Sequence, residues 1–225
     1  MLINCAIGEK GAGDKVDDTL MSLIDIATIA CGAHAGDAQS IKYYQDLAQQ
    51  HNVKAAAYLS YPDVDGVDEA DRNRVLMDSL EQQARTFGKM QCVKFQGELY
   101  KHLNRSVDLA ENVVDWLKQM DVDEVIAPYR SMLHKVCSEH KMQVTYEAYA
   151  DKSYSSMSLG LELMSRDQVG SNIDNVDDIC RQVRKMKQGV IEIEGHNYLI
   201  EAETLCLDSH SPQAVQNVEA VKKIL

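Results

Sequence analysis

The sequence has no long apolar run, no cationic stretch and no closely spaced cysteine pair, and each absence excludes a class of protein. No segment approaches the roughly 20 apolar residues that cross a bilayer, so we expect no membrane association. Lysine and arginine never run longer than two, and 23 of them stand against 35 acidic residues, which gives the 225-residue chain a net charge of −12. A nucleic acid would require a cationic surface, so we expect no nucleic-acid partner.

The six cysteines lie at wide spacings without a C-x-x-C pair, which argues against a disulfide framework and a zinc ribbon. The first nine residues have no basic segment and reach an acid at once, so they predict a strand rather than a signal peptide. Reduced thiols and the lack of a leader predict a cytoplasmic protein.

Strand-like apolar segments alternate with helical patterns along the chain. We expect strands at residues 2–6, 25–30, 53–58, 90–95, 124–127, 143–147 and 204–207. We expect helices at residues 39–50, 68–89, 106–120, 129–141, 175–188 and 212–225, the last with Pro212 in its first turn. Residues 190–200 predict a small hairpin, and the long, Ser-rich segment 149–173 predicts an irregular functional loop.

This alternation predicts an α/β fold with a parallel sheet. No linker or internal repeat divides the chain, so we expect one domain over residues 1–225. Seven such units can close into a barrel or form an open doubly wound sheet, and we favour the barrel. No G-x-G-x-x-G follows the first strand, which argues against a dinucleotide-binding fold.

In a parallel α/β fold the active site lies at the carboxyl ends of the strands. Polar residues follow most of the expected strands at this end. They are Gly8-Glu9, the segment from Cys31 to Asp37, Tyr61 to Asp63, Gln96 to Glu98, Asp151-Lys152, and Asp208 to His210.

Several of these segments resemble the motifs of one protein family. The segment from Ala30 to Asp37, Ala-Cys-Gly-Ala-His-Ala-Gly-Asp, closely resembles the signature of the LamB/YcsF family, the A subunit of bacterial 5-oxoprolinase. Weaker matches keep the family's order along the chain. They are Asn4 to Glu9 (N-x-D-x-G-E), Tyr61 to Asp63, Lys94 to Tyr100 (K-P-H-G-x-L-Y), Glu147 to Lys152 (E-x-x-A-D-R) and Leu163 to Gly170 (L-x-x-R-x-x-x-G).

The resemblance implies a seven-stranded (β/α) barrel of the glycoside hydrolase/deacetylase type. It also implies ATP-dependent opening of the cyclic amide 5-oxoproline to glutamate, together with B- and C-type partner subunits. The residues we expect to act in catalysis are Glu9, His34, Asp37 and Lys94. Those we expect to bind substrate are Asp63, Gln96, Asp151 and Arg166.

The sequence departs from the family pattern at polar positions. Ala6 replaces the opening Asp, Tyr58 and Gln96 replace two histidines, and Lys152 replaces an Arg. The closing H-G-D becomes Asp-Ser-His at residues 208–210. A divalent metal is not expected, because a catalytic zinc needs three protein ligands. A non-catalytic or regulatory paralogue, or a hydrolase of another small substrate, is therefore an alternative to an active 5-oxoprolinase subunit.

The residues themselves suggest specific roles. Asp37 can cap the helix that follows it, or contact a ligand. Lys94 lies inside an apolar strand and should pair with an acid such as Glu9 or Asp37. Glu9 lies in a Gly-rich loop whose amides can approach an anion. We expect Glu9, His34, Asp37 and Lys94 to share one cavity at the carboxyl face. Asp208 and His210 are a further candidate acid/base pair.

Overall fold

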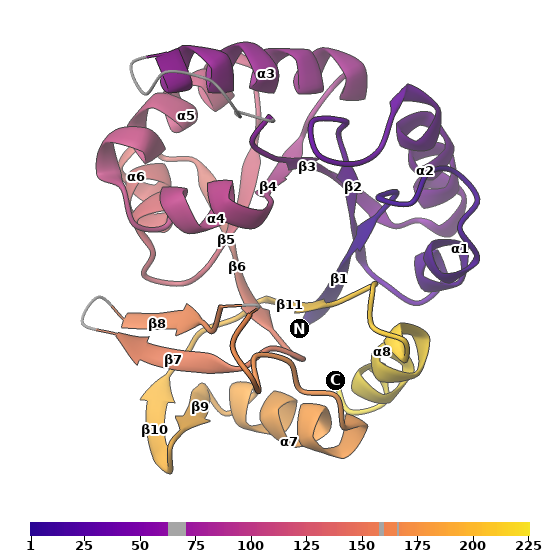
Figure 1. The fold of residues 1–225 in the computed structure, drawn as a ribbon, viewed down its shortest axis with the longest axis vertical. Coiled ribbons are helices and arrows are strands. Elements are labelled where there is room, and N and C mark those ends of the chain that lie inside the picture. Colours follow the sequence, from indigo (N-terminus) through magenta and orange to yellow (C-terminus); the bar gives the residue numbers. More distant parts are fainter. Residues whose placement is uncertain (63–70, 158–159, 166) are drawn as a thin grey trace.

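Seven parallel strands close into a barrel in the computed structural model, which describes residues 1–62, 71–157, 160–165 and 167–225 (Figure 1). The barrel strands are β1 (Leu2–Ile7), β2 (Ile26–Ala30), β3 (Lys54–Leu59), β4 (Cys92–Phe95), β5 (Glu124–Ala127), β6 (Gln143–Tyr149) and β11 (Thr204–Leu207). Their order around the ring is β1-β11-β6-β5-β4-β3-β2, so the first and last barrel strands are neighbours. The predicted barrel is confirmed, and the open sheet is excluded.

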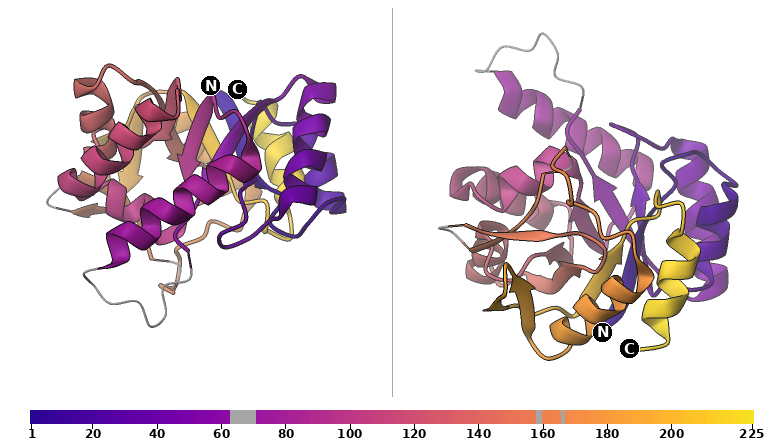
Figure 2. Two further views of the ribbon diagram at one scale, coloured as in Figure 1. Left: turned by 90° about the horizontal axis from the view of Figure 1, so that it is seen from above. Right: turned by 60° about the horizontal axis from the view of Figure 1, so that its bottom comes forward.

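Helices surround the barrel on its outer side (Figures 1 and 2). They are α1 (Lys15–Met21), α2 (Ala38–His51), α3 (Arg72–Phe87), α4 (Gly97–Leu103), α5 (Val107–Gln119), α6 (Met132–Glu139), α7 (Val176–Met186) and α8 (Ala214–Lys222). Several begin where a short polar side chain accepts hydrogen bonds from the first free backbone amides. Asp14, Ser106, Ser131 and Asn175 act in this way for α1, α5, α6 and α7. No helix of the described segments is long and apolar enough to cross a membrane.

The barrel interior follows from the two-residue period of its strands. Toward the amino ends, Ile26, Ala56, Cys92 and Ile126 form a small apolar layer inside the ring. The alternate residues of the same strands, such as Val93, belong to the main core outside the ring, beneath the helices. Polar residues of the same strands lie at both ends: Glu124 pairs with Lys54 at the amino end, and Lys94 lies further toward the carboxyl end.

Two antiparallel hairpins are inserted before β11. The hairpin of β9 (Val190–Ile193) and β10 (His196–Leu199) confirms the prediction for residues 190–200. The segment expected to be an irregular loop contains a second hairpin, β7 (Tyr154–Met157) and β8 (Gly160–Leu163). Its serine content hides the strand pattern, and a long-range ion pair between Arg105 and Glu162 joins β8 to the segment between α4 and α5.

Two further elements differ from the expectation. The seven-residue helix α4 starts directly after β4 and is too short to show a helical period in the sequence. The last helix begins at Ala214, and Pro212 precedes it in a turn that is closed by the hydrogen bond from Ala214 N–H to the Ser211 carbonyl.

Candidate active site at the carboxyl end of the barrel

The family departures converge on the mouth of the barrel. Asn4 and Lys94 meet inside the ring, where Lys94 Nζ donates to Asn4 Oδ1 at 3.1 Å. Residues two positions further along the same strands share this inward face. Ala6 and Gln96 therefore lie one layer closer to the carboxyl end, and Tyr58 pairs in register with Lys94. Substitutions scattered along the sequence thus alter one surface.

Beneath the mouth lies a fully buried ion pair. Lys94 Nζ is 2.5 Å from Glu147 Oε1, and both side chains are inaccessible to solvent. Asn4 Nδ2 donates to Glu147 Oε1 at 2.9 Å, and Lys94 Nζ also donates to Cys206 Sγ at 3.2 Å. We expected Lys94 to pair with an acid such as Glu9 or Asp37. This prediction is wrong, because the acid that Lys94 contacts inside the barrel is Glu147. A signal for Glu147 was present: an acid within an apolar strand, in the E-x-x-A-D-R-like stretch.

Aromatic rings separate this pair from solvent. Lys94 Nζ lies 5.5 Å from the ring centre of Tyr58 and 4.9 Å from that of Tyr149. Burial lowers the pKa of Lys94, but Cys206 and Glu147 raise it, and the net pKa is above its usual value. Burial also raises the pKa of Cys206 to about 12, so Cys206 is a neutral thiol at pH 7 and Glu147 supplies the counter-charge. Lys94 is therefore a charged group that organises the interior beneath the site.

An accessible polar cluster lies above the sealed pair. Glu9 follows β1, and its carboxylate accepts a hydrogen bond from Gln96 Nε2 at the end of β4. The second oxygen of Glu9 lies 3.1 Å from His210 Nε2, in the turn after β11. His210 Nδ1 is 3.5 Å from Asp208 Oδ1, and the His210 side chain is 46% exposed. The histidine thus bridges two carboxylates and still faces solvent.

The cluster continues from Asp208 to the end of β6. Lys152 Nζ lies 2.6 Å from Asp208 Oδ2, and the Asp208 backbone N–H donates to Asp151 Oδ2 at 2.7 Å. Burial raises the pKa of Asp151 to about 6. Burial alone would raise the pKa of Asp208, but hydrogen bonds from His210 and Lys152 lower it below its usual value. The hydrogen bond to Asp208 raises the pKa of His210, with help from the charge of Glu9.

The other predicted site residues have different surroundings. His34 is exposed in the loop after β2, with no hydrogen bond or ion pair to the described part of the chain. Asp37 caps α2 in a capping box with Ser40, and the Ser40 backbone N–H lowers the pKa of Asp37. Asp63 and Arg166 lie outside the described residues.

The Gly-rich loop after β1 is occupied by its own contacts. Gly8 N–H donates to Asp17 Oδ2 at 2.9 Å. Burial raises the pKa of Asp17 to about 6, which is still below pH 7, so the carboxylate is mostly ionised at neutral pH. Tyr44 Oη accepts from Asp14 N–H and donates to the Gly11 carbonyl. The Gly8 amide and the Gly11 carbonyl of this loop are therefore engaged by side chains of the same chain. Within the described ranges, no group of three His, Cys, Asp or Glu side chains could hold a metal ion.

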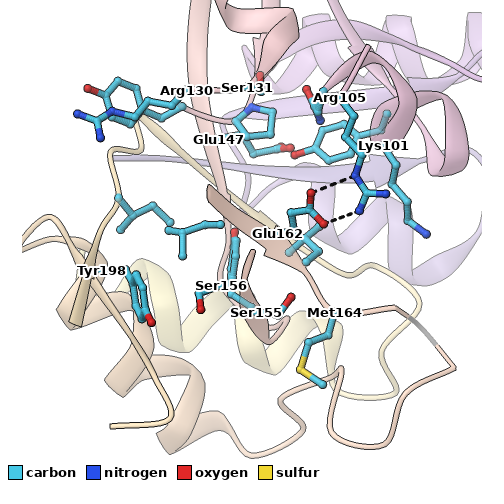
Figure 3. Close-up of a pocket in the computed structure, with 18 of the residues that line it drawn as sticks. Lys101, Arg105, Arg130, Ser131, Glu147, Ser155, Ser156, Glu162, Met164 and Tyr198 are labelled. Atoms are coloured by element: carbon cyan, nitrogen blue, oxygen red, sulfur yellow. Dashed lines mark hydrogen bonds and ion pairs between the residues drawn. The ribbon is translucent and has the colours of Figure 1, made fainter. Parts of the chain in front are cut away.

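A separate cleft of about 930 Å³ opens beside the mouth (Figure 3). Its walls come from α4, the β5–α6 loop, the β7–β8 hairpin and β10. Glu147 lines this cleft, whereas none of the four expected catalytic residues does. Their shared cavity therefore stays a prediction.

Comparison with known proteins now places the chain among relatives. The 5-oxoprolinase A subunit of Pyrococcus horikoshii is 28% identical over 99% of this chain and 92% of that protein. The 5-oxoprolinase A subunit of Bacillus cereus is 27% identical over 97% of this chain and 92% of that protein. The crystal structure of a lactam utilization protein from Thermus thermophilus superposes with a TM-score of 0.78 at 22% identity, covering 99% of this chain and 94% of that one, and shares the fold. The profile of the LamB/YcsF family matches residues 1–225, and the chain belongs to this family.

Proposed function

We propose that this chain is the A-type subunit of an ATP-dependent 5-oxoprolinase, which opens the lactam to glutamate together with B- and C-type subunits. The observation that carries the proposal is His210, a solvent-facing histidine held between Glu9 and Asp208 at the carboxyl end of the barrel. The naming of the relatives as A subunits of 5-oxoprolinase supports the substrate.

Lactam hydrolysis needs an acid that protonates the leaving nitrogen. The pKa of His210 is raised by Asp208 and Glu9, which favours the protonated imidazole near neutral pH. In our proposal His210 gives its proton to the nitrogen as the C–N bond breaks. It takes over a role that Gln96 cannot fill, because an amide does not exchange protons at neutral pH.

The water that attacks the carbonyl carbon needs a base, and the expected candidate is His34. The strands β2, β1 and β11 are neighbours, so the loops that carry His34, Glu9 and His210 adjoin at one edge of the mouth. The water oxygen bonds to the carbonyl carbon, and its proton passes to His34. Lys152 is the nearby cation that can stabilise the developing oxyanion.

The ATP requirement is assigned to the assembled complex. In the Gly-rich loop of this chain, Asp17 already occupies the amide at Gly8, which argues against a polyphosphate there. We therefore place nucleotide binding on the partner subunits or at their contact with this chain, and no chemical step here depends on it.

The test is glutamate release from 5-oxoproline by the purified chain, alone and with B- and C-type subunits of a relative, with and without ATP. We expect little turnover by the chain alone, because Ala6, Tyr58 and Gln96 replace an acid and two histidines of the family pattern. Turnover should appear in the complete mixture with ATP. Rapid turnover by the single chain, or none in the complete mixture, would contradict the proposal.

One observation favours a second candidate, a non-catalytic paralogue that retains the partner surface. Tyr58 stands where the family has a histidine, and it covers Lys94 from above with 7% of its own surface exposed. A chain that binds the partner subunits in size-exclusion chromatography, without supporting glutamate release, would favour this candidate.

A further inference from the structure

The β9–β10 hairpin ends in a strand with a free edge. β10 lies on the outer side of β9 (Figure 1), and its other side pairs with no strand of the described segments. Asn197, Tyr198 and Leu199 of this strand line the cleft beside the barrel mouth. We propose that the free edge of β10 pairs with an extended segment of a partner subunit, and that this segment carries an acidic side chain. The inference rests on the proposed function for the identity of the partner, and it adds the surface that the partner binds.

The hydrogen-bond register of the hairpin identifies the free backbone groups. The Ile200 N–H donates to the Gly189 carbonyl at 3.0 Å. In an antiparallel pair, the N–H and C=O of one residue point toward the partner strand, and those of the next residue point away. Tyr198 therefore bonds to β9, whereas Asn197 and Leu199 direct their N–H and C=O groups to the open edge. An added strand needs donors and acceptors at this two-residue spacing.

The edge of β10 has none of the side chains that usually prevent pairing. Exposed strand edges in natural proteins often carry lysine, other charged residues or proline. The sequence of β10 is His-Asn-Tyr-Leu, without any of these. Its Leu199 side chain is 72% exposed, so an added strand would also cover apolar surface. Both the backbone and the side chains of this edge therefore favour a bound segment.

The acidic side chain is assigned from the cations around the cleft. Lys101 pairs with Glu98, and Arg105 pairs with Glu162 (Figure 3). Arg130 lines the same cleft as β10, and no carboxylate of the described ranges pairs with it. Arg130 is therefore the cation that is available to an acid of the bound segment.

Arg130 is held in position before a partner binds. Its φ of +62° is left-handed, which costs free energy in a residue other than glycine. Its N–H donates to His134 Nδ1 at 3.0 Å, and its guanidinium lies 5.1 Å from the ring centre of Tyr129. Tyr129 in turn stacks on His134, with the ring centres 5.7 Å apart. An arginine ordered in this way loses little conformational entropy on binding, and arginine and tyrosine are common in interface hot spots.

A second copy of this chain fits the edge less well than another protein does. Residues 196–199 contain no acid that could meet Arg130. Two chains that each have a net charge of −12 also repel one another. A partner subunit can supply both the strand and the carboxylate, and the cleft of about 930 Å³ has room for its side chains.

Hydrogen exchange resolved to single amides tests the proposal on the unaltered chain. The Asn197 and Leu199 amides should exchange rapidly in the free chain, because only water bonds to them. In the complex with B- and C-type subunits of a relative, we expect both to exchange at least about tenfold more slowly. The Tyr198 amide, which already bonds to β9, should change less.

No complex, or a complex with unchanged exchange at Asn197 and Leu199, would overturn the proposal. Slower exchange that appears in the free chain as its concentration rises would assign the edge to a second copy, and would overturn it as well.

Two substitutions at one position separate the backbone from the side chain. Leu199→Pro removes an N–H that β9 does not use, so the hairpin should remain intact. Leu199→Thr keeps the N–H and shortens the apolar side chain. We expect Leu199→Pro to weaken the complex about tenfold, and more than Leu199→Thr does. Equal effects would refute the backbone pairing. If Leu199→Pro does not fold, the exchange of the unaltered chain decides.

Arg130→Ala should weaken the complex by a larger factor at low salt than at high salt, because the lost contact joins two charges. Arg184→Ala, at an exposed arginine on α7, is the matched control and should bind like the parent. Unchanged affinity in Arg130→Ala would refute the assigned acid. None of these measurements depends on catalysis, and His210→Gln should form the same complex. A protected β10 without glutamate release would therefore count against the proposed function alone.

Discussion

At the scale of single residues, His210 combines contacts that favour its charged form with access to solvent. Asp208, Glu9 and Lys10 are the charged groups that act on it, and the two carboxylates outweigh the lysine. A raised pKa in a half-exposed side chain is the property that a proton donor at neutral pH requires. The signal in the sequence was only an Asp-Ser-His turn after the last strand.

We predict a pH-dependent contribution of His210 to stability. Because its folded-state pKa lies above the usual 6.5, the protonated form stabilises the fold below about pH 6.5. That contribution is lost as the pH rises through the folded-state pKa. Thermal melting should show the parent more stable than His210→Gln at pH 6, with the difference shrinking toward pH 8. A difference that grows with pH would contradict the assigned contacts.

A second prediction concerns the buried pair. Lys94→Met leaves the Glu147 carboxylate without a counter-charge in a dry interior, and we expect a loss of about 3–5 kcal/mol in the free energy of unfolding. The double variant Lys94→Met/Glu147→Leu removes both charges and should recover much of this loss. Urea denaturation of both single variants and the double variant measures the coupling. Strictly additive losses would show that the two side chains do not act as a pair.

At the scale of elements, the loop between β2 and α2 illustrates how a family motif can be structural. Asp37 accepts the Ser40 N–H at 2.7 Å, and Ser40 Oγ accepts the Asp37 N–H at 2.8 Å. Gly36 has a φ of +83°, and a Cβ there would approach the Ala30 carbonyl oxygen to 2.6 Å. The motif therefore fixes the turn that presents His34.

We predict that Asp37→Ala lowers the melting temperature because α2 loses its cap, while Asp37→Asn, which retains an accepting oxygen, lowers it less. Glutamate release by the complete mixture should persist in both variants after correction for folded protein. An Asp37→Asn variant as stable as the parent but without activity would instead assign Asp37 to catalysis, as the sequence first indicated.

The turn itself is tested by two glycine substitutions. Gly36→Ala and Gly11→Ala both place a side chain at positive φ, but nothing lies within 4 Å of a Cβ at Gly11. Gly36→Ala should therefore reduce the free energy of unfolding by about 1–3 kcal/mol more than Gly11→Ala. Urea denaturation compares them, and equal losses would mean that the backbone relaxes around Ala30.

At the scale of the whole molecule, the barrel could be predicted because local patterns determine it. Each strand is a short apolar run, and the helices between them carry caps such as Ser106 and an apolar face. Contacts across the ring could not be predicted in the same way. Lys94 contacts Glu147, and His210 contacts Glu9, because the closed barrel brings together strands that are distant in the sequence. The sequence could therefore place polar residues at the ends of strands, but it could not name the residues that they contact.

The positions of the family departures at the mouth of the barrel allow a prediction of what restoring the family residues would do. Ala6→Asp, Tyr58→His and Gln96→His alter adjacent layers of one interior surface, so they should act as a unit, and single changes should show little. The triple variant should release glutamate faster with partner subunits. Loss of the Tyr58 ring above Lys94 should make it less stable by on the order of 1–3 kcal/mol. No gain by a variant that melts cooperatively would indicate a site rebuilt for another substrate.

The most direct test of the central claim is the pH dependence of kcat/KM for 5-oxoproline, measured with partner subunits and ATP. We expect the rate of the parent to fall as the pH rises through the pKa of His210. His210→Gln should lose roughly 10²- to 10⁴-fold in rate and no longer show that fall. His34→Gln should lose rate but keep the fall, and His51→Gln, at an exposed histidine at the end of α2, should resemble the parent. A His210→Gln enzyme with the parent's rate and pH profile would contradict the account.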